Sequence, residues 1–218
     1  MVEVKICGLR SRGDLAAAAS AGAALGGLVF YPPSPRHVTL ADARWMAAAL
    51  PEGLPLVALT VDATDAEIEA ILDAVPIAML QLHGAETPER AAALRERFRL
   101  PVMKAVGVSE EGDLEGLPDY AGAVDMLLID ARPPEGAEIP GGNGVAFDWR
   151  LVRDVAFPAP WMLAGGLTPE NVAEAIRLTG AERVDVSSGV EKARGVKDPA
   201  RIAAFVKAAQ AAEAAIPG

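Results

Sequence analysis

Val2-Glu3-Val4-Lys5-Ile6-Cys7-Gly8 is the first strand-like segment of the chain, and it separates the two common parallel α/β folds. Its alternation of side chains predicts a β-strand with one apolar face. An open dinucleotide-binding sheet would carry Gly-x-Gly-x-x-Gly directly after such a strand. Here Leu9 and Arg10 follow Gly8, so that turn is missing. The segment therefore argues against an open nucleotide-binding sheet.

Seven further short apolar runs follow, and segments with an apolar period near 3.6 residues separate them. Helix starts are marked by Thr87-Pro88, Thr168-Pro169 and Asp198-Pro199, and by the capping-box spacing of Thr64 and Glu67. Eight such units predict an α/β fold, a (β/α)8 TIM barrel with parallel strands, as a single domain over residues 1–218. The strand candidates are Val2–Ile6, Leu25–Phe30, Leu56–Val61, Ala78–Leu82, Val102–Ala105, Met126–Ile129, Trp161–Ala164 and Arg183–Val186.

Composition limits the class of partner. Of the 218 residues 51% are hydrophobic and 23% are charged, which is typical of a globular domain. The net charge of −10 argues against a nucleic-acid partner, whereas a local pocket can still hold a small anion. The single cysteine excludes an internal disulfide and a cysteine-based zinc site. Since neither a signal peptide nor a membrane-spanning run is evident, we expect a cytoplasmic protein with no membrane partner.

Cys7 ends the predicted interior face of the first strand, with Lys5 two residues below it. Active sites of such barrels lie at the carboxyl ends of the strands. A nearby ammonium group favours the thiolate, which is the form that acts as a base or nucleophile. The alternative is that Cys7 is only a small buried apolar residue, as free cysteines commonly are.

Asp130 closes the sixth apolar run, and by parity its side chain points inward with those of Met126 and Leu128. A carboxyl group in apolar surroundings there would stay protonated and could serve as a general acid. Alternatively, Asp130 only caps the turn that opens the long Pro- and Gly-rich loop over residues 131–145.

Glycine-rich loops follow the seventh and eighth strands, where many barrels of this kind bind phosphate through backbone N–H groups. One loop alone would be weak evidence, because glycine turns are common. The predicted phosphate-binding residues are Gly165, Gly166, Ser187, Ser188 and Gly189.

Other polar residues near the predicted strand ends are candidates for contacts with the ligand. Arg36 lies in a proline-stiffened loop after the second strand, and its planar guanidinium could hold a carboxylate. The alternative for Arg36 is an ordinary solvated arginine. Gln81 and His83 share the interior face of the fourth strand, and Asp185 that of the eighth. Two histidines far apart in sequence do not predict a metal site.

Together these motifs resemble the phosphoribosylanthranilate isomerases of tryptophan biosynthesis. The matching strings extend along nearly the whole chain. They are Val4-Lys5-Ile6-Cys7-Gly8-Leu9, Phe30-Tyr31 through Ser34-Pro35-Arg36, Gln81-Leu82-His83-Gly84, Leu128-Ile129-Asp130, Gly141-Gly142-Asn143-Gly144 with Phe147-Asp148-Trp149, Leu163-Ala164-Gly165-Gly166-Leu167, and Val184-Asp185-Val186-Ser187-Ser188-Gly189-Val190-Glu191.

The resemblance implies an Amadori rearrangement of N-(5-phospho-β-D-ribosyl)anthranilate, with Asp130 as general acid, Cys7 as general base and Arg36 on the anthranilate carboxylate. It also implies the loops after strands seven and eight as the phosphate site, with Lys5, Gln81, His83 and Asp185 as further substrate contacts. No cofactor is expected, and the partner is a small phosphosugar. Small barrels of this kind occur as monomers or homodimers.

One departure from the family pattern and three alternatives remain. Val145-Ala146 stand where the family often has Lys-Thr, which puts a polar contact of that loop in doubt. The loop over residues 130–144 is the predicted lid.

The alternatives are another phosphosugar isomerase or epimerase, a non-catalytic phosphate-binding barrel, and an interaction protein. A bifunctional isomerase that also serves histidine biosynthesis would be expected to carry aspartate at the position of Cys7.

Overall fold

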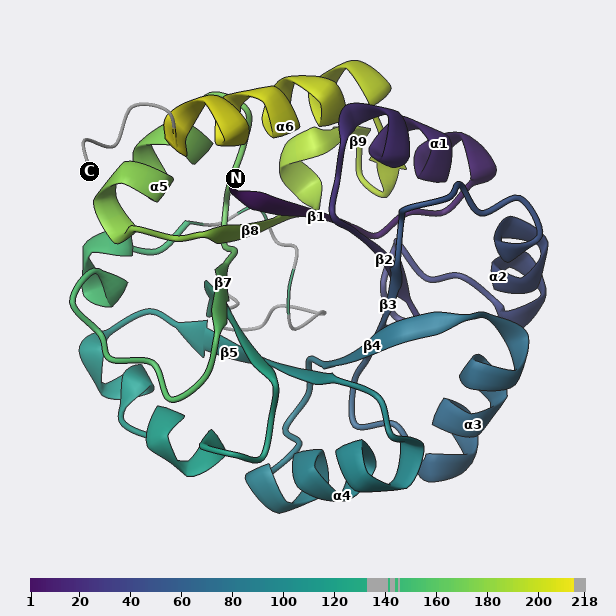
Figure 1. Cartoon of the computed structure of the whole chain (residues 1–218), viewed down its shortest axis with the longest axis horizontal. Coiled ribbons are helices and arrows are strands. Elements are labelled where there is room, and N and C mark those ends of the chain that lie inside the picture. Colours follow the sequence, from purple (N-terminus) through teal and green to yellow (C-terminus); the bar gives the residue numbers. More distant parts are fainter. Residues whose placement is uncertain (133–140, 142–143, 145, 214–218) are drawn as a thin grey trace.

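A closed barrel of eight parallel strands forms the centre of the molecule, with each strand paired to the next and β8 to β1 (Figure 1). The computed structural model describes residues 1–132, 141, 144 and 146–213. All eight predicted strands are present, and the (β/α)8 barrel is confirmed. The strands are β1 Glu3–Cys7, β2 Leu25–Val29, β3 Leu56–Thr60, β4 Ile77–Leu82, β5 Val102–Val108, β6 Met126–Ala131, β7 Trp161–Leu163 and β8 Arg183–Val186.

Alternation along β1 sorts its side chains between the two layers of the core. Val4 and Ile6 are buried on the outside of the barrel, where the helices pack against the strands. Lys5 and Cys7 point inward, as the pattern predicts. A separate apolar cluster of Met103, Leu128, Met162 and Ala164 fills the interior on other strands. The inward-pointing side chains of Lys5 and Cys7 therefore lie in a barrel whose interior is filled with side chains on other strands.

Helices surround the barrel (Figure 1), and their starts follow the capping signals only in part. Thr64 and Glu67 form a capping box, and Thr87 precedes a proline-initiated helix. At Thr168-Pro169 the α-helix begins three residues late, because Asn171 and Thr168 bond to backbone groups in a preceding turn. The α-helices in the described residues are α1 Arg12–Ala21, α2 Leu40–Ala47, α3 Asp65–Ala74, α4 Pro88–Phe98, α5 Val172–Thr179 and α6 Pro199–Glu213.

The units after β5 and β6 depart from the expected helical pattern. The segment between these strands forms two short 3₁₀ helices, η1 Glu111–Leu114 and η2 Leu117–Tyr120. Gly112, Gly116 and Pro118 interrupt this segment, and both residue types disfavour a continuous α-helix. After β6, the described residues contain only η3, Trp149–Val152, before β7 begins.

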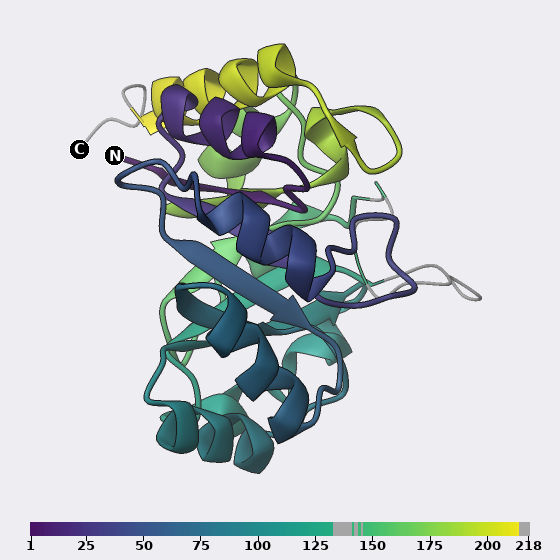
Figure 2. The ribbon, with the colours of Figure 1, turned by 90° about the vertical axis from the view of Figure 1, so that its right-hand side faces the viewer.

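A small antiparallel hairpin lies between β8 and α6, outside the eight-fold repeat. After η4 (Ser188–Val190), the strands β9 Glu191–Ala193 and β10 Val196–Lys197 pair with each other, with Lys197 opposite Glu191. In the side view of Figure 2 the hairpin lies at the opposite end of the barrel from the N-terminus. It is therefore at the end where the strands finish.

Candidate active site

An open cavity of about 780 Å³, a volume that includes its mouth, lies at the carboxyl ends of the strands. Its walls come from the ends of seven strands or from the loops that follow them. Ten of the twelve predicted site residues line this cavity. They are Cys7, Arg36, Gln81, His83, Asp130, Gly165, Gly166, Asp185, Ser187 and Ser188.

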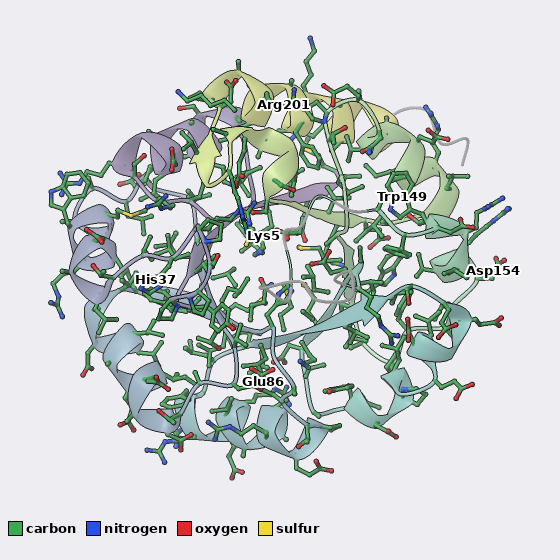
Figure 3. All side chains as sticks on the ribbon, turned by 180° about the vertical axis from the view of Figure 1, so that it is seen from behind. Lys5, His37, Glu86, Trp149, Asp154 and Arg201 are labelled. Carbon is green, nitrogen blue, oxygen red and sulfur yellow. The ribbon has the colours of Figure 1, made fainter. Side chains whose placement is uncertain are left out.

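Lys5 and Gly189 are not among the lining residues. Lys5 is fully buried below the cavity, near the centre of the ring of strands in Figure 3. Its Nζ donates to Asp185 Oδ1 at 2.9 Å. Burial acts to lower the pKa of Lys5, but the charges of Asp185 and Cys7 outweigh it and hold the pKa above its ordinary value. Lys5 therefore places a buried positive charge beneath the cavity, next to Asp185 and Cys7.

Cys7 lies in the cavity wall against Val29 and Leu59, and only 4% of it is exposed. Burial raises the pKa of its thiol, because the charged thiolate is poorly solvated there. Lys5 opposes this effect, whereas Asp185 adds to it. Lys5 therefore acts on Cys7 in the expected direction, but burial outweighs it, and the Lys5 ammonium is also paired with the Asp185 carboxylate, so the net shift favours the thiol.

Asp130 faces His83 across the cavity wall, with 3.5 Å between Asp130 Oδ2 and His83 Nε2. The other imidazole nitrogen, Nδ1, lies 2.9 Å from Gln81 Nε2. If the amide donates to Nδ1, the imidazole proton is on Nε2 and points at Asp130. Asp130 Oδ1 also accepts from the N–H of Ala131 at 2.8 Å. Its surroundings are thus more polar than the apolar setting that the sequence predicted.

Arg36 is buried in the cavity wall, so it is not a solvated surface arginine. The side chain crosses the end of β1 at Gly8, whose φ of +78° and lack of a Cβ leave room for it. Its Nε and one Nη donate to Glu191 at 2.7 and 3.0 Å. A ligand carboxylate would therefore meet a guanidinium that already holds a carboxylate on one edge.

Glu191, Lys197 and Glu86 are buried charged residues near the cavity for which the sequence pattern predicts no role. Lys197 Nζ donates to Glu191 and to the backbone carbonyl of Ser187. Glu86, labelled in Figure 3, is nearly buried and accepts the N–H groups of Asp62 and Gly84, which ties together the loops after β3 and β4. Glu191 is the last residue of the string Ser187-Ser188-Gly189-Val190-Glu191, but no local sequence pattern predicts its contact with Lys197.

Gly189 shapes the loops after β7 and β8 without lining the cavity. A Cβ at this position would overlap the backbone carbonyl of Leu167, so the loops after β7 and β8 can approach only because residue 189 is glycine. Their closeness brings Gly165 and Gly166 to the same cavity as Ser187 and Ser188.

Substitution Gly189→Ala should separate these two loops. We expect a loss of about 1–3 kcal/mol in the free energy of unfolding, typical of overpacking. We also expect weaker binding of phosphorylated ligands, measured by calorimetry. Gly112→Ala is the matched control, because nothing lies within 4 Å of the added methyl group. Unchanged stability and binding in Gly189→Ala would contradict this account of the loops.

Part of the predicted site lies outside the described residues. Of the expected lid over residues 130–144, residues 133–140, 142 and 143 are not described. Val145, which departs from the family pattern, is not described either.

Within the described ranges, there is no group of three or more His, Cys, Asp or Glu side chains arranged for a metal ion. In those same ranges no helix is long and apolar enough to cross a membrane.

The chain as a whole is similar to one enzyme family. Residues 4–208 match the family described as N-(5'-phosphoribosyl)anthranilate (PRA) isomerase. An N-(5'-phosphoribosyl)anthranilate isomerase of Cereibacter sphaeroides is 63% identical over 209 residues, which cover 96% of this chain and 99% of the relative.

Solved structures agree with the sequence match. The crystal structure of phosphoribosyl anthranilate isomerase from Thermotoga maritima has a TM-score of 0.85 and 38% identity, covering 97% of this chain and 100% of that chain. Another isomerase structure, solved in complex with reduced 1-(o-carboxyphenylamino)-1-deoxyribulose 5-phosphate, has a TM-score of 0.83 and 36% identity at the same coverage. The chain belongs to the N-(5'-phosphoribosyl)anthranilate isomerase family.

Proposed function

We propose that this chain converts N-(5-phospho-β-D-ribosyl)anthranilate to 1-(2-carboxyphenylamino)-1-deoxy-D-ribulose 5-phosphate in tryptophan biosynthesis. The observation that carries the proposal is that Cys7 of β1 and Asp130 of β6 line one cavity at the catalytic end of the barrel. A base and an acid on separate strands can reach different atoms of one bound sugar. The similar phosphoribosylanthranilate isomerases, one of them solved with reduced 1-(o-carboxyphenylamino)-1-deoxyribulose 5-phosphate, support the choice of substrate.

The proposed reaction begins with general acid catalysis. Asp130 donates its proton to the ring oxygen of the ribose while the bond between C1 and that oxygen breaks. The lone pair of the anthranilate nitrogen forms the C=N bond of an open-chain protonated Schiff base. Asp130 is left as a carboxylate, which His83 Nε2 is positioned to stabilise from 3.5 Å.

The second step is general base catalysis by Cys7. The thiolate removes the proton from C2, and the C–H electron pair forms a C1=C2 double bond as the Schiff base becomes a neutral enolamine. The enolamine then takes a proton at C1 from water and loses the proton of the hydroxyl group on C2 to water, which gives the ketone, and proton exchange with water returns Cys7 to the thiolate and Asp130 to the acid. Atoms and charge balance without a redox or metal cofactor.

The remaining cavity residues are proposed to hold the ends of the substrate. The loops that contain Gly165, Gly166, Ser187 and Ser188 would bind the phosphate, mainly through backbone N–H groups. Arg36 would bind the anthranilate carboxylate. Gln81, His83 and Asp185 supply polar groups for the wall between these ends.

Substitution Arg36→Lys tests the carboxylate site. Lysine keeps the charge but loses the planar fork that holds two carboxylates at fixed angles. We expect KM to rise about 10- to 100-fold, corresponding to the ~1.5–3 kcal/mol of a hydrogen bond to a charged group. The change in kcat should be smaller, because Arg36 is remote from the reacting bonds in this scheme. A KM equal to that of the wild type would contradict the assignment of Arg36.

A coupled fluorescence assay tests the proposed function itself. The substrate is made in situ from anthranilate and phosphoribosyl pyrophosphate by an anthranilate phosphoribosyltransferase, and its fluorescence is followed after the chain is added. Loss of the signal at an enzyme-dependent rate supports the proposal. Lack of conversion by the folded wild-type protein would overturn it and favour a different phosphosugar substrate or a binding function.

A further inference from the structure

The β9–β10 hairpin contributes a buried ionic cluster to a fold whose eight-fold repeat does not require it. Glu191 of β9 and Lys197 of β10 face each other in the hairpin register. The Glu191 side chain is 5% exposed, and that of Lys197 is completely buried. Burying a charge costs free energy even when it is paired, so this buried pair indicates a specific role for the hairpin.

Four hydrogen bonds saturate the Glu191 carboxylate. Oε1 accepts from Arg36 Nε at 2.7 Å and from Lys197 Nζ at 2.9 Å. Oε2 accepts from Arg36 Nη2 at 3.0 Å and from the N–H of Gly195 at 2.9 Å. Although burial acts to raise the pKa of Glu191, these donors outweigh it and lower the pKa below its ordinary value. Glu191 is therefore held as an anion in a fixed orientation.

The same cluster reaches the catalytic strands. Lys197 Nζ donates to the carbonyl oxygen of Ser187 at 2.8 Å, and Ser187 Oγ donates to the carbonyl oxygen of Cys7 at 3.2 Å. Glu191 thus connects the Arg36 loop after β2 with the ends of β8 and β1. Arg36 and Lys197 place two cationic groups against the one negative charge of Glu191, which partly offsets the lowering of the Lys197 pKa by burial. Among these three side chains one positive charge remains beside a cavity that Arg36 lines.

We propose that Glu191 is a positioning residue for ligand recognition, which orients the Arg36 guanidinium for a ligand carboxylate and neutralises one of two buried cations. The inference rests on the proposed function, because it takes the ligand to carry a carboxylate. Glu191 acts through Arg36 and does not touch the reacting atoms. The hairpin then serves as a support for the carboxylate end of the cavity.

A double-mutant cycle with Glu191→Gln and Arg36→Met tests this inference. Glu191→Gln keeps the shape of the side chain but removes its charge, and we expect KM to rise about 10- to 100-fold while kcat changes less. If Glu191 acts through Arg36, Glu191→Gln should have little further effect on KM in the Arg36→Met background. Lys192→Gln, an exposed position on the same hairpin, is the matched control. Additive effects on KM would overturn the proposal.

Ligand binding provides a readout that needs no turnover. The probes are reduced 1-(o-carboxyphenylamino)-1-deoxyribulose 5-phosphate, which carries the carboxylate, and ribose 5-phosphate, which does not. Glu191→Gln should weaken the first and leave the second nearly unchanged in calorimetry. Equal weakening of both would identify a purely structural role and overturn the inference. Wild-type protein that fails to turn over substrate would refute the proposed function, whereas this comparison tests the inference separately.

A second variant covers the case in which Glu191→Gln does not fold because Lys197 loses its partner. Glu191→Gln/Lys197→Met removes both members of that pair and leaves Arg36 without its carboxylate support. We expect the same selective loss of the carboxylate-bearing probe in this folded double variant. Wild-type affinity for that probe would overturn the proposal.

Discussion

Cys7→Ser should lower kcat/KM about 10³-fold, within the range typical of general base catalysis, while the product analogue still binds. The serine hydroxyl occupies nearly the same space but is a far weaker acid than a thiol, so it cannot supply the base at C2. Circular dichroism and calorimetry with the reduced product analogue would show that the fold and the site are intact. Wild-type kcat/KM in the folded variant would refute the assignment of Cys7 as the base.

The buried setting of Cys7 also predicts a pH dependence. Because burial raises the pKa of this thiol, the thiol form predominates in the free protein at neutral pH. The sign follows from the thiolate: the rate of iodoacetamide labelling should increase as pH rises from neutral into the alkaline range, whereas kcat/KM should not rise in parallel, because the proposed reaction also needs Asp130 in its protonated form. The chain has one cysteine, so mass spectrometry of the labelled protein reports this site alone. A flat labelling profile would contradict the account of Cys7.

Asp130→Asn should lower kcat/KM about 10²- to 10⁴-fold, the range typical of proton transfer by a positioned acid. The amide matches the carboxyl group in shape and can still face His83, but it has no acidic proton to give to the ring oxygen. Binding of the product analogue should therefore change much less than turnover. A variant that loses binding and turnover equally would indicate a substrate-holding role for Asp130 instead.

The strands and the inward-facing side chains could be predicted because both depend on local alternation. Cys7, Asp130 and His83 line one cavity of the closed barrel, because each lies at or just after the carboxyl end of a strand. The breaks after β5 could also have been foreseen from Gly112 and Pro118, which disfavour an α-helix.

The charge state of the site could not be predicted, because it depends on contacts between distant segments. Lys5 stands two residues from Cys7, yet its partner is Asp185, 180 residues away. The same holds for Arg36, which meets Glu191 at a sequence separation of 155 residues. Local pattern identifies which side chains face the cavity, but burial and pairing across the barrel determine their electrostatics.

The most direct test of the acid–base assignment is the kinetic isotope effect with substrate deuterated at C2 of the ribose. In Cys7→Ser, removal of the C2 proton should limit the rate, so deuterium should slow the reaction by a full primary isotope effect. In Asp130→Asn, ring opening should limit the rate, so the isotope effect should fall close to unity. The reverse pattern, or equal isotope effects in the two variants, would contradict the roles given to Cys7 and Asp130.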